Sequence, residues 1–207
     1  MITDTLLKNH PIISNQVDPR ELRVVLHELE QLLQAGKTGA VVELGCYVGT
    51  TSLFLRRLLD AYNYTGELHV YDSFEGLPSK TSEDQSVAGD QFVTGELHAT
   101  RKQLIQNFKK AGLKLPVIHK GWFSDLTTHD IPATVMFAFL DGDYYESIKD
   151  SFRVVTPRLA PEATILVDDY ASEALPGAAQ ATNEWARQHH LTVQSQASLG
   201  IIRLRAQ

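Results

Sequence analysis

The chain has 207 residues, 43% hydrophobic and 21% charged, which is typical of one soluble globular domain long enough to bury a core. Its 19 Lys and Arg against 25 Asp and Glu give a formal net charge of -6, which argues against nucleic-acid and membrane-surface partners but allows a small anionic cofactor. A single cysteine excludes an intramolecular disulfide. Without a long apolar stretch we expect neither export nor a membrane span, so the predicted location is cytoplasmic.

The first 38 residues (1–38) are predicted to form a helical appendage. Asp18 and Pro19 mark a helix start, Glu21 is placed to close a capping box, and apolar residues at helical spacing continue to Gly36. No domain boundary follows the appendage, so all 207 residues are expected to belong to one domain.

Beyond the appendage, short apolar runs alternate with amphipathic segments. Strands that alternate with helices predict an α/β fold with a mostly parallel sheet and helices on both of its faces. The last two apolar runs predict a closing antiparallel hairpin. The predicted strands are 40–44, 68–71, 117–119, 135–140, 164–167, 191–195 and 200–204, and the predicted helices are 50–62, 100–112, 144–158 and 177–189.

Residues 73–97 form a polar connection that contains several glycines and acids. A structureless connection of this length is unusual in a compact domain, and long loops are often functional. We therefore expect this segment to be an active-site lid.

A glycine loop follows the first strand, from Gly45 to Gly49. In open α/β sheets ligands bind outside the carboxyl ends of the strands, and glycines there let the backbone approach a ligand. The G-x-x-x-G spacing is neither the G-x-G-x-x-G that holds a pyrophosphate nor a P-loop. The alternative is that the two glycines only make a tight turn.

Two acids flank this loop and suggest the nature of the ligand. Glu43, inside the strand end, would repel a phosphate but suits a cationic group, and Asp72, at the end of the second strand, is placed to accept hydrogen bonds from ribose hydroxyls. A nucleoside with a positive charge and no phosphate is S-adenosylmethionine, which we therefore predict as the cofactor.

Two later strands also end in acids, Asp141 with Asp143 and Asp168 with Asp169. Burying a charge is costly unless it is paired or coordinates a metal, and carboxylates suit Mg²⁺ or a similar hard cation. The alternative is that these acids cap the next helix or turn of the chain, as Asp143 could do for the helix that begins at Tyr144. Capping accounts for one acid at each strand end, whereas each strand end carries two.

Several short sequence motifs together resemble those of the macrocin O-methyltransferase (TylF-type) family, whose members include sugar-methylating enzymes of macrolide and aminocoumarin biosynthesis. The resemblance covers about residues 41–170 and rests on these phrases in this order: ELGCYVGTTS, YDSFEGLP, FVTGEL, KGWFSDL, FLDGDYYES and LVDDY. It implies the class I methyltransferase fold, a Rossmann-like sheet of seven strands, and O-methylation with S-adenosylmethionine.

The resemblance also implies a set of cofactor-binding residues. The loop after the first strand would hold the methionine end, the residues after the second strand would surround the ribose and adenine, and two residues after the third strand would lie at the adenine edge. In chain order these residues are Glu43, Gly45, Tyr47, Gly49, Thr51, Asp72, Ser73, Phe74, Gly121 and Trp122.

Metal dependence is a further implication, with Asp141, Asp168 and Asp169 as ligands. A metal would neutralise these acids, and it could bind an acceptor hydroxyl and lower its pKa. Catechol-type methyltransferases share the acids but usually carry a lysine directly after the D-x-D, where this chain has Tyr144. Asp143, Asp141 or a hydroxide on the metal is left to take the proton, and Asp143 is preferred because Asp141 is committed to the metal.

The expected function is therefore metal-dependent O-methylation of a hydroxyl on a small molecule, with a sugar of a secondary metabolite as the favoured acceptor. A homodimer is compatible with this function. A catechol-type enzyme with a phenolic substrate is the first alternative. A D-x-D glycosyltransferase would leave the glycine loop unexplained, and a non-catalytic nucleoside-binding protein would leave the acids without a role.

Overall fold

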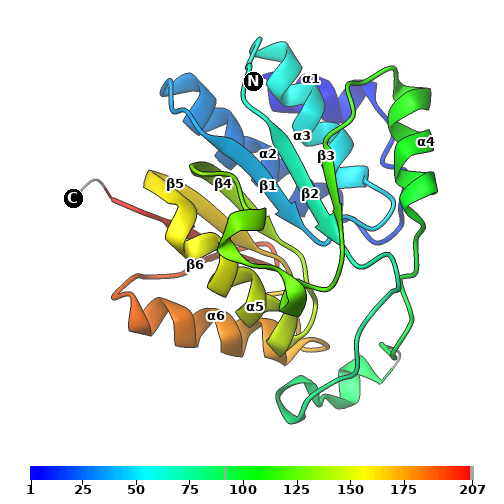
Figure 1. Cartoon of the computed structure of the whole chain (residues 1–207), viewed down its shortest axis with the longest axis vertical. Coiled ribbons are helices and arrows are strands. Elements are labelled where there is room, and N and C mark those ends of the chain that lie inside the picture. The colour runs from blue at the N-terminus through cyan, green and yellow to red at the C-terminus, as the bar shows by residue number, and fades with distance from the viewer. Residues whose placement is uncertain (91, 206–207) are drawn as a thin grey trace.

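In the computed structural model, which describes residues 1–90 and 92–205, a central sheet organises the chain (Figure 1). Its strands are β1 (Ala40–Leu44), β2 (Leu68–Asp72), β3 (Val117–Lys120), β4 (Val135–Leu140), β5 (Leu159–Val167), β6 (Gln194–Gln196) and β7 (Leu199–Arg203). The order across the 7-stranded sheet is β3-β2-β1-β4-β5-β7-β6. The first five strands are parallel, and β7 and β6 are antiparallel to their neighbours, which confirms the predicted sheet and closing hairpin.

Helices cover both faces of the sheet. They are α1 (Ile2–Asn9), α2 (Pro19–Gln34), α3 (Thr50–Ala61), α4 (Arg101–Ala111), α5 (Tyr145–Val155) and α6 (Pro176–Gln188). Side chains from α1 to α4 join one hydrophobic cluster, and those from α5 and α6 join a second cluster on the opposite face. None of these helices is long and apolar enough to cross a bilayer.

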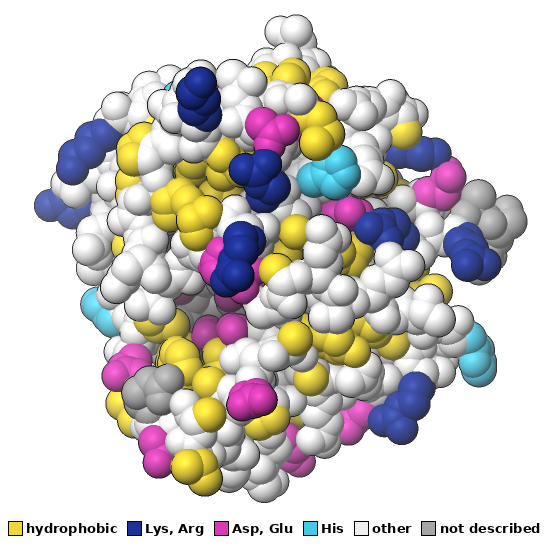
Figure 2. Space-filling model, turned by 180° about the vertical axis from the view of Figure 1, so that it is seen from behind, with side chains coloured by type: hydrophobic (Ala, Val, Ile, Leu, Met, Phe, Trp, Pro, Cys, Tyr) yellow, Lys and Arg dark blue, Asp and Glu magenta, His cyan; other side chains and the backbone are white. Residues whose placement is uncertain are grey.

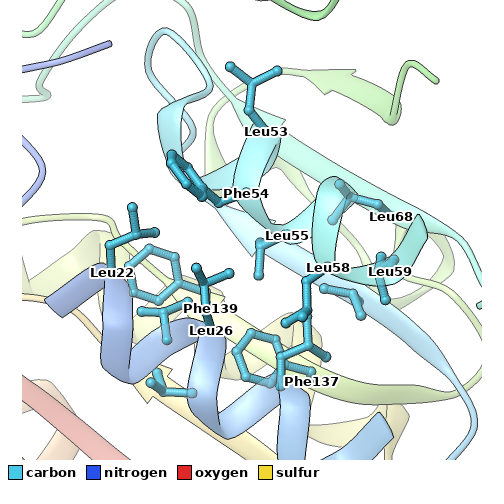
Figure 3. Packing of buried hydrophobic residues seen from close by; sticks show 14 of the residues in the cluster. Leu22, Leu26, Leu53, Phe54, Leu55, Leu58, Leu59, Leu68, Phe137 and Phe139 are labelled. Atoms are coloured by element: carbon cyan, nitrogen blue, oxygen red, sulfur yellow. The ribbon is translucent and has the colours of Figure 1, made fainter. Parts of the chain in front are cut away.

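The two clusters follow from the two-residue repeat of a strand. In β1, Val41 faces the first cluster and Val42 the second, because successive side chains point to opposite faces of a sheet. Figure 3 shows Leu22 and Leu26 of α2 beside Phe139 in the first cluster. Burying each such side chain stabilises the fold by about 1.5–3 kcal/mol, and this packing holds the sheet that carries the site.

The start of α2 differs in one detail from its prediction. The carboxylate of Asp18 accepts a hydrogen bond from the N–H of Arg20 at 2.7 Å, so Asp18 caps the helix as expected. The predicted capping box is wrong, because the carboxylate of Glu21 accepts the hydroxyl of Ser198 instead. Ser198 lies in the turn between β6 and β7, so this contact joins the two ends of the chain.

The helix α1 lies within the predicted helical appendage but was not predicted as a separate helix, and its stabilisation comes from a distant residue. The N–H groups of Ile2 and Thr3 donate to the buried carboxylate of Glu30 at 2.9 and 3.3 Å. A helix of 8 residues is too short to be stable in isolation, so this tertiary cap and the burial of Leu6 hold it in place.

The strand β5 begins five residues earlier than predicted, at Leu159 rather than at residue 164. The additional residues include Pro161 and Glu162, and Glu162 has a positive φ of 63°. The pairing of β4 with β5 is irregular in this region. Only the apolar end of the strand, which leads to the acids, had a recognisable strand pattern.

Candidate active site

A cavity of about 330 Å³ opens at the carboxyl ends of the parallel strands. Seen from behind, the surface is hollowed, and acidic side chains lie within the hollow (Figure 2). The predicted site residues that line the cavity are Glu43, Gly45, Tyr47, Thr51, Asp72, Ser73, Gly121, Trp122, Asp141, Asp143, Asp168 and Asp169. The structure therefore brings the predicted cofactor loop and the strand-end acids into one place.

Gly45 lets two strand ends approach each other closely. Its φ is +95°, and a Cβ at this position would lie 1.7 Å from the carbonyl oxygen of Asp141. Backbone bonds fix the contact, because Gly45 donates to the carbonyl of Tyr71 and Asp141 donates to that of Leu44. Only glycine fits here, so the cofactor loop and the acids after β4 share one rigid backbone junction.

We expect Gly45→Ala to lower the free energy of unfolding by about 2–4 kcal/mol and to abolish cofactor binding, because the new methyl group must push Asp141 away. Gly112→Ala is the matched control. Gly112 also has a positive φ, of +66°, but has no atom within 4 Å of an added Cβ, so it should lose only about 1 kcal/mol. Urea unfolding measures both, and equal losses would contradict a role for the contact with Asp141.

Two predicted cofactor residues lie outside the cavity lining. Gly49 begins α3 with a φ of +87°, and an added Cβ would lie 2.3 Å from Cδ1 of Leu104 in α4. Phe74 is 4% exposed and belongs to the first hydrophobic cluster. Neither residue therefore faces the cavity in this structure.

Asp72 holds the glycine loop in place. One of its carboxylate oxygens accepts the N–H groups of Cys46 and Tyr47 at 3.0 and 2.9 Å, and the other accepts the N–H of Phe74 at 2.7 Å. A carboxylate offers about four acceptor positions, so about one remains for a ligand. The predicted ribose contact is thus combined with a structural role that the sequence did not indicate.

Two further polar groups lie beside the loop. Glu43 is 1% exposed and accepts the hydroxyl of Ser52, and its burial raises its pKa to about 8. Thr50, which was not selected from the sequence, lines the cavity at the N-terminus of α3 and has a buried hydroxyl without a partner among the described residues. A buried hydroxyl without a partner beside a helix N-terminus fits a ligand with an anionic group, such as the carboxylate of S-adenosylmethionine.

The strand-end acids converge in this cavity. One carboxylate oxygen each from Asp141, Asp143 and Asp169 lie within 4.8 Å of one another. Asp168 lines the same cavity, but its carboxylate accepts the N–H of Asp169 at 2.9 Å. Asp143 therefore joins the predicted ligands Asp141 and Asp169 in this cluster, and the predicted role of Asp168 as a metal ligand stays a prediction. The backbone of Asp143 and Asp169 is left-handed, with φ values of 61° and 55°, so the chain turns sharply after each strand.

Each of these acids makes ionisation of the others less favourable. Burial and the neighbouring carboxylates raise the pKa of Asp141 and Asp168 well above the usual range. The same causes raise the pKa of Asp143 and Asp169 to about 7. The described residues that line the cavity include no lysine or arginine. Three converging carboxylates without a cationic side chain are a donor set that fits Mg²⁺ or a similar cation.

The capping alternative is wrong for Asp143. Tyr144 precedes α5 and makes no side-chain cap, and the N–H of Tyr145 donates to Asp84 at 2.7 Å. Asp84 lies in the segment 73–97 and was not selected from the sequence. A separation of 61 residues leaves no local signal for this contact.

The strand order, the glycine loop after β1 and the acids after β2, β4 and β5 define a class I methyltransferase fold. The chain belongs to the macrocin-O-methyltransferase (TylF) family, which it matches over residues 13–197. This finding confirms the resemblance that the sequence phrases indicated.

Similar proteins include two enzymes of secondary metabolism. One, from Streptomyces olivaceus, is 8-demethyl-8-(2,3-dimethoxy-alpha-L-rhamnosyl)-tetracenomycin-C 4'-O-methyltransferase, 33% identical over 70% of this chain and 58% of that enzyme. Another is mycinamicin III 3''-O-methyltransferase of Micromonospora griseorubida, 25% identical over 89% of this chain and 75% of that enzyme. The O-methyltransferase NovP has the same fold, with a TM-score of 0.80 and 21% identity over 93% of this chain and 82% of NovP.

Proposed function

We propose that the protein is an S-adenosylmethionine-dependent, divalent-metal-dependent O-methyltransferase that acts on a hydroxyl of a sugar moiety in a secondary metabolite. One observation carries the proposal: a single cavity contains both the glycine loop and three converging carboxylates. The family and the names of the two enzymes above support O-methylation of a sugar.

S-adenosylmethionine supplies a methyl group on a positively charged sulfur. In the proposal, Gly45 and Thr50 receive the methionine end, and Asp72 uses its remaining acceptor position for the ribose. Glu43 lines the cavity beside the glycine loop. Trp122 lines the cavity and is 37% exposed, so an adenine ring can stack on it.

A divalent cation would be held by Asp141, Asp143 and Asp169 and would supply positive charge beside the reacting oxygen. Asp168 orients this group, because its carboxylate fixes the backbone N–H of Asp169. Asp143 takes the proton from the acceptor hydroxyl as the oxygen accepts the methyl group.

The segment 73–97 acts as a lid in this proposal. Leu77 packs with Tyr144 and Leu175 in a third hydrophobic cluster beside the acids. Such a cover excludes water from the transfer, which strengthens electrostatic interactions inside the cavity.

Asp72→Ala should weaken the binding of S-adenosylmethionine by about 2–3 kcal/mol, because a hydrogen bond to a charged acceptor is stronger than a neutral one. The variant should also unfold at a lower temperature, because the N–H groups of Cys46 and Tyr47 lose their acceptor. Calorimetric titration measures the affinity. Glu75→Ala is the control, because Glu75 is exposed and pairs with Lys120 outside the cavity. An unchanged affinity in folded Asp72→Ala would remove Asp72 from the cofactor site.

The proposed function is tested by incubating the protein with S-adenosylmethionine, Mg²⁺ and panels of glycosides, phenols and nucleotide-activated sugars. Mass spectrometry should show one added methyl group on a glycoside. Methylation confined to the phenols would favour the catechol-type alternative. Binding of a sugar nucleotide without binding of S-adenosylmethionine would favour a glycosyltransferase.

A further inference from the structure

Asp84 is a fully buried acid that the proposed chemistry does not use. It ends the short 3-10 helix η1 (Ser82–Asp84) in the segment 73–97 and is 0% exposed. One carboxylate oxygen accepts the N–H of Tyr145 at 2.7 Å, and the other accepts the N–H and the hydroxyl of Thr81 at 2.9 and 3.0 Å. Burial of a carboxylate is costly unless it is hydrogen-bonded, so Asp84 has to keep these partners, and they fix the position of η1.

The bond to Tyr145 puts Asp84 at the N-terminus of α5. The first N–H groups of a helix have no partner within the helix, and a carboxylate is the preferred group to satisfy them. The residue in the N-cap position, Tyr144, provides no side-chain bond. The cap of α5 is therefore supplied by the lid, from a distant part of the chain.

The neighbouring helix α6 leaves room for this carboxylate. A Cβ on Gly177, the second residue of α6, would lie 1.9 Å from Oδ1 of Asp84 and 2.8 Å from the nitrogen of Tyr145. Any larger residue at this position would displace Asp84. The acid thus fills a gap between the N-termini of α5 and α6 in which only glycine is compatible.

A second bond from the lid reaches the adjacent residue. The hydroxyl of Tyr144 donates to the carbonyl of Phe92 at 3.1 Å, and Tyr144 is 1% exposed. The lid therefore contacts both residues that directly follow Asp143. Asp143 itself has a φ of 61°, a conformation that the chain around it has to enforce.

We propose that Asp84 is a positioning residue, which couples the seating of the 73–97 lid to the orientation of Asp143. The inference rests on the proposed function, in which Asp143 is the base. With Asp84 bound to Tyr145, the tight turn from Asp141 to Tyr144 is held at its C-terminal end by the lid. When the lid leaves, α5 loses its cap and the turn is released.

The test compares three variants with the native protein. Asp84→Ala removes the cap, and Asp84→Asn keeps an oxygen acceptor for Tyr145. Asp90→Asn changes an exposed acid of the same segment and is the control. Hydrogen exchange should become at least tenfold faster in 141–150 and in the lid for Asp84→Ala, but not for the other two variants. Unchanged exchange in 141–150 overturns the proposal, whether or not the protein transfers methyl groups.

Two further measurements separate positioning from general support. The affinity for Mn²⁺, used alone as a probe, should fall about tenfold in Asp84→Ala because Asp143 is one of the converging carboxylates. With an acceptor that the native protein methylates, kcat should fall about 10²-fold while the KM for S-adenosylmethionine stays within about threefold. Asp84→Asn should restore most of both. If kcat is unchanged and only the KM for the acceptor rises, Asp84 serves only to hold the lid closed over the cavity, and the proposal is overturned. No turnover by the native protein would contradict the proposed function alone.

Discussion

EDTA is expected to abolish methyl transfer completely, and Mg²⁺ is expected to restore it. Without a cation, Asp141, Asp143 and Asp169 are half-buried beside one another, with no lysine or arginine among the described residues of the cavity lining. Asp169→Asn should lose turnover by about 10³-fold or more while it retains S-adenosylmethionine, because the cofactor rests on the other side of the cavity. Asp125→Asn, which changes an exposed acid after β3, is the control. Full activity in chelator, with no metal found by elemental analysis, would make the acid cluster purely structural.

The same cluster predicts how pH affects the metal-free protein. Burial raises the pKa of Asp143 and Asp169 to about 7, above the value of about 4 in an unfolded chain. A carboxyl group whose pKa is raised on folding adds stability below its unfolded pKa, and this stability is lost as the pH rises through the folded pKa. The EDTA-treated protein should therefore melt several degrees lower at pH 8 than at pH 5.5, and Mg²⁺ should restore the melting temperature mainly at pH 8.

Asp143→Asn is expected to slow methyl transfer by about 10²–10⁴-fold, the usual contribution of a general base. The affinity for S-adenosylmethionine should remain within about threefold, because Asp143 is not placed at the predicted cofactor loop. Asp143 is also one of the three converging carboxylates, so the variant should need more Mg²⁺.

A titration with Mg²⁺ separates the two roles of Asp143. If Asp143 is the base, turnover stays low at saturating Mg²⁺, because an amide cannot take the proton. Recovery to the native rate at high Mg²⁺ would show that Asp143 only binds the cation. Glu146→Gln is a matched control, since Glu146 lines the same cavity but is bonded to Lys149.

The centre of the sheet was predictable because β1, β4 and the end of β5 are largely apolar runs that lead directly to a glycine or an acid. The predicted bounds of β1 and β4 agree with the structure residue for residue. The run at β5 was predicted too short, because Pro161 and Glu162 interrupt its pattern, although Leu159 before them still pairs with β4. Strand patterns in sequence report burial, whereas the ends of a strand are set by pairing.

The acids of the site were also predictable, since a charged residue at the end of a buried strand has few structural explanations. Which acids converge was not predictable. The approach of Asp143 to Asp141 and Asp169 depends on two left-handed residues, and no local pattern marks these conformations at an aspartate. The bonds of Asp84 to Tyr145 and of Glu30 to Ile2 join residues far apart in sequence, so they arise only from the folded chain.

The gap at Gly177 has a consequence for exchanging parts between related enzymes. Transplanting the 73–97 segment is an obvious way to change which acceptor is methylated, because that segment supplies one wall of the cavity. The transplanted segment contains Asp84, and this carboxylate fits only because residue 177 in α6 is a glycine. Asp84 in the segment and Gly177 in α6 therefore have to be exchanged together, and a chimaera should carry both residues or neither.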